Sequence, residues 1–241
     1  MSTMRQLMKK VLLLSLSLSL FSAQSFAFDA KDWKLRLRGL AIVPDDSSTT
    51  TVLNNTTGQG SGVTVDNNLV PEIDITYMLS SHWGIEVIAG VSNHDISVDG
   101  TSTATLAALG VTDGTKLFDT WVLPPTVTFQ YHFLPENTFR PYLGAGINYT
   151  AFLADNATTT AETAFGGGIK VSTENVWGYA IQAGMDYDIS ESWYLNLDVK
   201  YIDIDTSAKL GVTSGALAGN VLNVDVDVNP WIVGIGIGYR F

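Results

Sequence analysis

The sequence predicts an all-β fold: an eight-stranded antiparallel transmembrane β-barrel with long external loops and short periplasmic turns. Three observations predict it, namely alternating apolar and polar residues in eight segments, evenly placed tryptophans, and connections of alternating length. The last segment, residues 229–241, has large apolar residues at every odd position from Trp231 to Phe241. In a strand tilted by about 40°, the ten residue steps from Trp231 to Phe241 span roughly 25 Å along the membrane normal. This is the height of the apolar band on an outer-membrane barrel.

Seven further segments alternate in the same way. In the first, Trp33, Leu35 and Leu37 share one face, and Lys34 and Arg36 occupy the other. A period of two belongs to a strand and not to a helix. The predicted strands are residues 32–44, 69–79, 83–94, 121–133, 140–152, 177–188 and 193–205.

The tryptophans and the connections set the predicted topology. Three tryptophans open ascending strands at a lower rim, and three others open descending strands at an upper rim, which predicts two aromatic girdles. The lower set is Trp33, Trp83 and Trp193, and the upper set is Trp121, Trp177 and Trp231. The long connections, rich in Ser, Thr, Gly and Asn, are residues 45–68, 97–120, 153–176 and 206–220. A soluble, lipocalin-like barrel is the alternative, but its loops would rarely be sorted so cleanly by length.

The first 27 residues predict a secretory signal peptide. Arg5, Lys9 and Lys10 precede an apolar run over residues 11–21, and Ser-Phe-Ala ends at Ala27. The remaining residues, 28–241, form one predicted barrel domain in the outer membrane of a Gram-negative bacterium. They carry 10 Lys and Arg against 24 Asp and Glu, a net charge of −14, which argues against nucleic acid as a partner. The absence of cysteine excludes disulfides and thiolate metal sites.

The inward face of the lower strands predicts a charged interior. Both signs occur together, and buried charges persist when they are paired, so we expect a salt-bridged plug. A proton relay or an ion filter is the alternative. The predicted plug residues are Lys34, Arg36, Arg38, Glu72, Asp74, Glu86, Arg140, Asp186, Asp198, Lys200 and Arg240.

The inward face of the upper strands predicts an apolar cup that is open to the outside and admits small apolar molecules. Its predicted lining residues are Leu40, Ile42, Val70, Ile88, Val122, Pro124, Phe152, Ile202 and Ile232. Prolines cannot donate ladder hydrogen bonds, so the wall is expected to be weak near Pro44, Pro71, Pro124, Pro125 and Pro230. A sideways exit into the bilayer follows as a hypothesis, and the alternative is that these prolines only mark strand ends.

Catalytic and metal sites are weakly indicated. Four carboxylates on the outward face of their strands, Asp203, Asp205, Asp225 and Asp227, are a weak candidate site for Ca²⁺ or Mg²⁺. The alternative is that they are solvated charges on a protruding hairpin. The three histidines, His82, His94 and His132, are scattered, and no Ser/His or Asp/His pair is expected to converge. The sequence therefore predicts neither an enzyme nor a cofactor.

Several motifs resemble the outer-membrane protein W (OmpW) family over essentially all of residues 28–241. They are Leu123-Pro-Pro-Thr126, Phe139-Arg-Pro-Tyr-Leu-Gly-Ala-Gly-Ile-Asn-Tyr-Thr150, Gln182-Ala-Gly-Met-Asp-Tyr187, Tyr201-Ile-Asp-Ile-Asp-Thr206 and Gly238-Tyr-Arg-Phe241. The resemblance implies a narrow hydrophobic channel that takes up small apolar molecules and releases them through the wall. It also implies a constriction at Ile88 and Trp177, although the alternation itself points Trp177 outward.

The predicted function is passive uptake of small hydrophobic molecules by a porin-like barrel with lateral exit. The alternative is a structural or receptor-like barrel that acts through its external loops. The expected partners are outer-membrane lipid and lipopolysaccharide, a small hydrophobic solute, and the barrel-assembly machinery, which would read the C-terminal Phe241. We expect a monomer.

Overall fold

The computed structural model describes residues 32–49, 51–54, 57–58, 60–100 and 103–241. The predicted signal peptide, residues 1–27, lies outside this part of the chain and stays a prediction.

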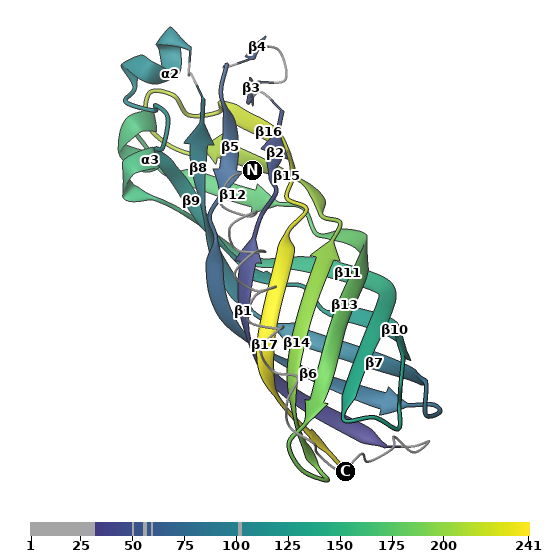
Figure 1. Ribbon diagram of the computed structural model, residues 1–241. Coiled ribbons are helices and arrows are strands. Elements are labelled where there is room, and N and C mark those ends of the chain that lie inside the picture. Colours follow the sequence, from purple (N-terminus) through teal and green to yellow (C-terminus); the bar gives the residue numbers. More distant parts are fainter. Residues whose placement is uncertain (1–31, 50, 55–56, 59, 101–102) are drawn as a thin grey trace.

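Eight antiparallel strands close into a barrel, as predicted (Figure 1). Around the wall the order is β10, β7, β6, β1, β17, β14, β13 and β11, and β11 pairs with β10 to close the ring. The barrel strands are β1 (Trp33–Val43), β6 (Asn68–Met78), β7 (Trp83–Gly90), β10 (Thr126–His132), β11 (Phe139–Ala157), β13 (Val176–Asp188), β14 (Trp193–Ile202) and β17 (Trp231–Arg240).

Side chains alternate between the outer surface and the interior because successive residues of a strand point to opposite faces. On β1, Lys34, Arg36 and Arg38 are buried, whereas Leu37 between them is 59% exposed. Large apolar side chains cover the outer surface of every barrel strand. This apolar surface faces the lipid.

Aromatic rings lie against one another at both ends of this apolar surface. At the lower end, Trp83 stacks on Phe129 with ring centroids 4.7 Å apart. At the upper end, Trp177 contacts Tyr149 at 4.7 Å between centroids. Rings of this kind mark the two membrane interfaces of an outer-membrane barrel.

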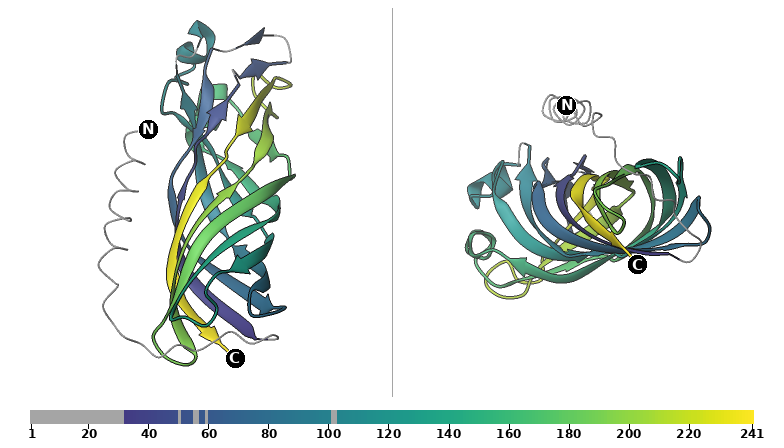
Figure 2. Two further views of the ribbon diagram at one scale, coloured as in Figure 1. Left: turned by 45° about the vertical axis from the view of Figure 1, so that its right-hand side comes forward. Right: turned by 60° about the horizontal axis from the view of Figure 1, so that its bottom comes forward.

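The long connections are external, as expected, but they are not irregular loops. They fold into strands that continue beyond the barrel and into two short helices (Figures 1 and 2). The strands are β2 (Ser47–Ser48), β3 (Val52–Leu53), β4 (Thr57–Gly58), β5 (Gly62–Val65), β8 (Ser92–Asp99), β9 (Lys116–Leu123), β12 (Ile169–Thr173), β15 (Asp205–Val212) and β16 (Val221–Asp227). The helices are α2 (Ala104–Ala108) and α3 (Thr159–Phe165). Within the described residues, neither helix has the length and apolarity needed to cross a bilayer.

The external strands form because they bury apolar residues of their own. Ile96 and Val98 of β8, Leu222 and Val224 of β16 and Phe165 of α3 belong to one cluster of buried side chains. We call this cluster the external core. Figure 2 shows the strands running from the lower end, where the C-terminus lies, up into this external part.

Candidate functional site

The lower half of the lumen is filled by ion pairs, which we call the charged plug. Lys34 Nζ lies 2.5 Å from Asp186 Oδ2, and Arg36 Nη1 lies 2.9 Å from Asp74 Oδ1. Arg36 also pairs with Glu86. These five side chains are fully or almost fully buried, so both signs of charge are neutralised within the barrel.

A second layer of the plug lies toward the cavity. Arg38 Nη2 lies 2.7 Å from Glu72 and 3.0 Å from Asp74, and its Nη1 lies 3.6 Å from Asp198. Lys200 completes the layer with Nζ 3.2 Å from Glu72. This layer closes the axial route toward the periplasm with charge.

The remaining two predicted plug residues lie near the lower opening. Arg140 pairs with Asp188, and Arg240 donates a hydrogen bond to the main-chain carbonyl of Glu191. All eleven side chains predicted for the plug are therefore buried in the lumen.

Other polar residues of the plug were missing from the sequence prediction. They lie on the inward face of their strands, and the alternation along each strand was the signal that could have identified them. These residues are Thr76, Thr128, Gln130, His132, Tyr142, Gln182, Asp188, Tyr194 and Asn196. Gln182 and Gln130 each donate 2.7 Å hydrogen bonds to Glu86 Oε2, and Tyr142 donates to Asp198 at 2.8 Å. These uncharged groups satisfy carboxylate oxygens that the cations leave free.

The glycines of β17 make room for side chains of the neighbouring strands. A Cβ at Gly238 would lie 2.1 Å from the ring of Tyr194, and a Cβ at Gly234 would lie 2.8 Å from the side chain of Leu40. The space that these glycines leave is filled by side chains of the neighbouring strands.

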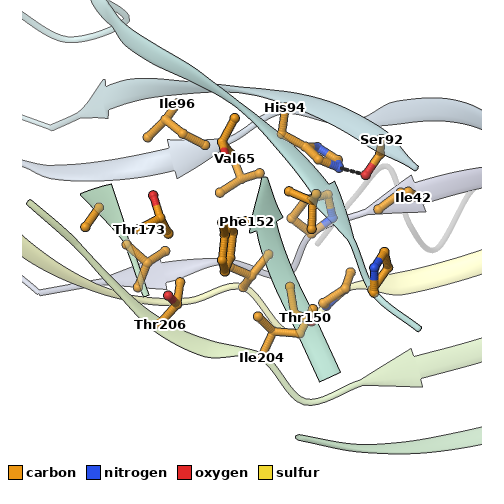
Figure 3. Close-up of a pocket in the computed structure, with 18 of the residues that line it drawn as sticks. Ile42, Val65, Ser92, His94, Ile96, Thr150, Phe152, Thr173, Ile204 and Thr206 are labelled. Atoms are coloured by element: carbon orange, nitrogen blue, oxygen red, sulfur yellow. Dashed lines mark hydrogen bonds between the residues drawn. The ribbon is translucent and has the colours of Figure 1, made fainter. Parts of the chain in front are cut away.

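An apolar cavity with a volume of about 80 Å³ lies between the plug and the external core (Figure 3). Six residues predicted for the upper lumen line it: Ile42, Val122, Pro124, Phe152, Ile202 and Ile232. Phe152 lies among the labelled lining residues in Figure 3, with Thr173 and Thr206 on one side and Thr150 on the other. An apolar lining of this kind suits an apolar ligand.

Four residues predicted for the lumen do not line the cavity: Leu40, Val70, Ile88 and Trp177. Val70 is half-buried and packs against the cluster that contains Leu40, Ile202 and Ile232. Leu40 and Ile88 are buried in the barrel but do not line the cavity. The prediction for Trp177 was wrong, because its side chain is 72% exposed on the outer surface, against Tyr149. No bulge interrupts β13 at this position, since Trp177 pairs with Tyr149 in the regular register, so the alternation of the strand keeps the indole outside.

The cavity is lined at its upper end by external strands as well as by the barrel. Its upper lining residues, including Ile96, Phe118 and Val226, also belong to the external core. The connections between the barrel strands continue upward as strands and bury apolar side chains around the top of the cavity.

A serine and a histidine converge on the cavity, contrary to the expectation that no such pair exists. His94 Nε2 lies 3.0 Å from Ser92 Oγ, and both residues line the cavity (Figure 3). His94 Nδ1 lies 3.1 Å from the main-chain carbonyl oxygen of Asp66 and 3.7 Å from its carboxylate. The spacing Ser-Asn-His in a strand was the missed signal, because residues two apart share one face.

The wall beside the cavity has a break in its backbone pairing. Two stretches face each other there without paired positions, residues 89–91 and residues 123–125. The ladders on either side, β7 with β10 below and β8 with β9 above, keep one common register. Pro124 and Pro125 cannot donate to a ladder, which accounts for the break, and Pro124 also lines the cavity.

On the other side of the segment 89–91, Ala89 and Gly90 pair with Ile73 and Glu72 of β6, and Val91 does not pair. The ladder between β6 and β7 begins at Glu72 and Gly90, so Val91 has no paired position on either neighbour. Pro71 stands next to Glu72 at this end of the ladder. The break therefore lies between two proline-containing stretches at the level of the cavity.

The four aspartates proposed as a weak metal site do not form one. Asp205 and Asp227 face each other across β15 and β16, whereas Asp225 faces Ser207. Within the described part of the chain, no three His, Asp or Glu residues gather closely enough to hold a metal ion. Burial raises the pKa of the Asp205 carboxyl, and the neighbouring carboxylates of Asp203 and Asp227 raise it further. These residues are solvated charge at the base of an external hairpin.

Comparison with known proteins agrees with this architecture. The model of the OmpW family matches residues 30–241. Outer membrane protein W of Vibrio cholerae is 35% identical over 225 residues, which cover 92% of this chain and 94% of that protein. An uncharacterized outer-membrane protein of Sinorhizobium fredii is 34% identical and covers 91% of this chain and 84% of its own length.

A solved structure shows the same fold. The outer membrane protein OprG from Pseudomonas aeruginosa is 34% identical and superposes with a TM-score of 0.78, covering 91% of this chain and 99% of that one. The closed barrel, its lipid-facing surface and these relatives agree with one another. The chain belongs to the OmpW family and is an outer-membrane β-barrel protein.

Proposed function

We propose that this protein lets small, mostly apolar molecules cross the outer membrane passively and without chemical change. One observation carries the proposal: an apolar cavity lies directly above a charged plug and beside a break in the wall. The cavity offers an apolar molecule a site away from water, which is favourable in proportion to the apolar area that it covers.

The plug supports a sideways exit. Moving an apolar molecule down the axis requires separating Arg38 from Glu72 and Asp74, and breaking a buried ion pair costs several kcal/mol. A path past Val91 and Pro124 breaks no ladder hydrogen bond and leads directly to the hydrocarbon of the bilayer. We therefore propose lateral release at residues 89–91 and 123–125.

Two further observations support an apolar solute. A protein of Pseudomonas aeruginosa that is 23% identical to this chain is named for a dibenzothiophene metabolism operon. The cavity of about 80 Å³ is smaller than the roughly 150 Å³ that accommodates benzene in a protein interior. It therefore suits a very small molecule or one end of a longer one.

We also propose that the chain acts as a monomer, because the closed ladder leaves no unpaired strand edge in the barrel. Its outer surface would meet lipopolysaccharide in the outer leaflet. Phe241 is 65% exposed at the end of the chain, where the barrel-assembly machinery would read it.

Passage without catalysis is favoured by the geometry around His94. The Nδ1 atom is nearer to the main-chain carbonyl oxygen of Asp66, at 3.1 Å, than to its carboxylate, at 3.7 Å. In a hydrolytic triad the carboxylate itself holds this nitrogen. Vesicles containing the protein should not hydrolyse p-nitrophenyl butyrate faster than vesicles without it.

Uptake measurements test the proposal. Cells that lack the endogenous gene, with or without this protein, would receive radiolabelled naphthalene, and the initial rate of uptake would be compared. Phe152→Asp places a carboxylate in the cavity and should remove the protein-dependent uptake, while Ser172→Asp, on an exposed site of β12, should leave it unchanged. Trp177→Ala should also leave uptake unchanged. Equal uptake by cells with and without the protein contradicts the proposal.

A receptor-like role of the external part is the second candidate, and the external core favours it. This core buries Val63, Leu106 and Phe165, so the external strands form an ordered platform. In that case, Phe152→Asp would leave adhesion unchanged, whereas a change in an exposed residue of α3, such as Thr163→Arg, would impair adhesion.

A further inference from the structure

The wall break would contain one hydrogen-bonded pair if its ladder were continuous. The common register of the ladders on either side puts Gly90 opposite Pro124. Bonded and non-bonded pairs alternate along antiparallel strands, and the His132 N–H donates to the carbonyl of His82 at 2.7 Å in the same register. Steps of two residues from this bonded pair lead to Gly90 and Pro124, so these two residues occupy a bonded position.

The proline explains the loss of only one of the two bonds at this position. In a bonded antiparallel pair, each residue donates its N–H to the carbonyl of the other. Pro124 has no N–H to donate. Its carbonyl could still accept from the N–H of Gly90, and that single bond would join the two sides of the break.

The carbonyl of Pro124 is instead held from inside the barrel. Asn148 Nδ2 donates to it at 3.1 Å, and Thr126 Oγ1 donates to it at 3.0 Å. Both donors belong to buried side chains. A carbonyl oxygen has two lone pairs, so these two donors use its whole capacity and leave none for Gly90.

The amide of Asn148 is held in this orientation by its other contacts. Its Oδ1 accepts a hydrogen bond from Thr150 Oγ1 at 2.7 Å, and its Nδ2 also donates to Thr126 Oγ1 at 2.9 Å. The carbonyl of Pro124 can only accept, so the atom next to it is the nitrogen. An amide nitrogen carries two protons and can therefore serve Pro124 and Thr126 together.

The main chain holds the proline stretch on the same side. The Tyr149 N–H donates to the carbonyl of Pro125 at 3.0 Å. Tyr149 and Asn148 both belong to β11, so Pro124 and Pro125 are bonded to β11 and have no paired position toward residues 89–91. The break therefore runs along only one side of the proline stretch.

We infer that Asn148 is a positioning residue for lateral release, because it holds inside the barrel the one acceptor that would otherwise pair with Gly90 and close the wall. The inference rests on the proposed function and assigns a residue to its exit. Asn148 does not line the cavity, so it acts through Pro124 and not by contact with the solute. Without the Asn148 amide, the carbonyl of Pro124 regains a lone pair and can accept from Gly90.

Hydrogen exchange of the Gly90 amide tests this assignment. The ¹⁵N-labelled protein in lipid nanodiscs would be compared with Asn148→Val, which removes the donor. We expect exchange at Gly90 to slow by roughly threefold to tenfold, the effect of one added hydrogen bond, whereas a general loosening of the barrel would make it faster. The Gly84 amide is the internal reference, because its partner Gln130 lies in the continuous part of the ladder.

A second donor variant and a matched control complete the comparison. Thr126→Val removes the other donor to Pro124 and should also slow exchange at Gly90, which keeps the test available if Asn148→Val does not fold. Asn148→Val should lower the protein-dependent uptake of naphthalene by roughly threefold to tenfold. Asn156→Val, at an exposed asparagine of the same strand, should change neither exchange nor uptake.

The outcomes separate the role of Asn148 from the proposed function. Exchange at Gly90 that is unchanged or faster in the folded variants overturns the assignment of Asn148. Slower exchange with unchanged uptake overturns its role in release and leaves the uptake function standing. Absence of protein-dependent uptake with the unsubstituted protein overturns the proposed function itself.

Discussion

The ring of Tyr194 lies over Gly238, its direct partner on the neighbouring strand, and a Cβ on that glycine would come within 2.1 Å of the ring. Tyr142 and Gly184 repeat this arrangement between β11 and β13, where the corresponding distance is 2.4 Å. The two rings lie 5.9 Å and 5.4 Å from the Arg36 guanidinium. The glycines thus make room for aromatic rings that border the central cation of the plug.

The first prediction concerns this fit. Gly238→Ala should destabilise the folded barrel by about 1–3 kcal/mol, because the added methyl group overpacks a filled site. The measurement is the fraction of folded protein in a urea titration, read from its heat-modifiable mobility on gels. Gly39→Ala is the control, since a Cβ at Gly39 meets no atom within 4 Å. Equal midpoints for the two variants would contradict the prediction.

The second prediction concerns the charged plug. Arg36→Met removes one of the two cations that pair with Asp74 and Glu86 and leaves the plug with a surplus of buried negative charge. We expect a loss of about 3–5 kcal/mol in the free energy of unfolding. Lys209→Met, which removes an exposed pair with Glu174, should change the midpoint of the same titration far less, because solvent screens an exposed ion pair. A loss at Arg36 no larger than that at Lys209 would show that the plug contributes little to stability.

The third prediction tests lateral release. The chain has no cysteine, so a disulfide can be introduced cleanly. Val91→Cys/Leu123→Cys places the pair on opposite positions of the wall break, and the oxidised protein should lose naphthalene uptake, which reduction should restore. The control is Val87→Cys/Val127→Cys, which joins β7 to β10 where the ladder between them is continuous. Uptake that survives oxidation of the first pair, once its cross-link is verified by mass spectrometry, rules out this exit.

The fourth prediction concerns the external hairpin. Because burial and the nearby carboxylates of Asp203 and Asp227 raise the pKa of Asp205, this carboxyl binds a proton more readily in the folded than in the unfolded protein. Its ionisation therefore opposes folding, and this penalty disappears as the pH falls through the raised pKa. Asp227→Asn should lower the pKa of Asp205 in a carboxyl NMR titration. Asp99→Asn, on β8, is the control and should not change it.

The alternation of residues was sufficient to predict the barrel and its charged interior. In β1, Leu35 and Leu37 lie outside and Lys34 and Arg36 inside, because a strand under lipid on one face admits no other arrangement. The same rule correctly pointed Trp177 outward, whereas the resemblance to relatives had suggested a place in the lumen. Parity was the more reliable guide to the direction of a side chain.

The external part was harder to predict because its strands are short and interrupted by polar turns. Ile96 and Val98 alternate as barrel residues do, but nothing in the local pattern shows that they share a cluster with Leu222 and Val224, more than a hundred positions away. Ser92 and His94 both fall within the predicted strand of residues 83–94, and their contact follows from the shared face of residues two apart in a strand.

The break beside Pro124 leaves the pairing above and below it in step. Widening the gap therefore requires no strand to slide along its neighbour, a movement that would turn every lipid-facing side chain of that strand inward. The proposed lateral exit would therefore need only local displacements at this one level. The strands above and below this level would keep their present pairing, so the barrel as a whole would not have to rearrange.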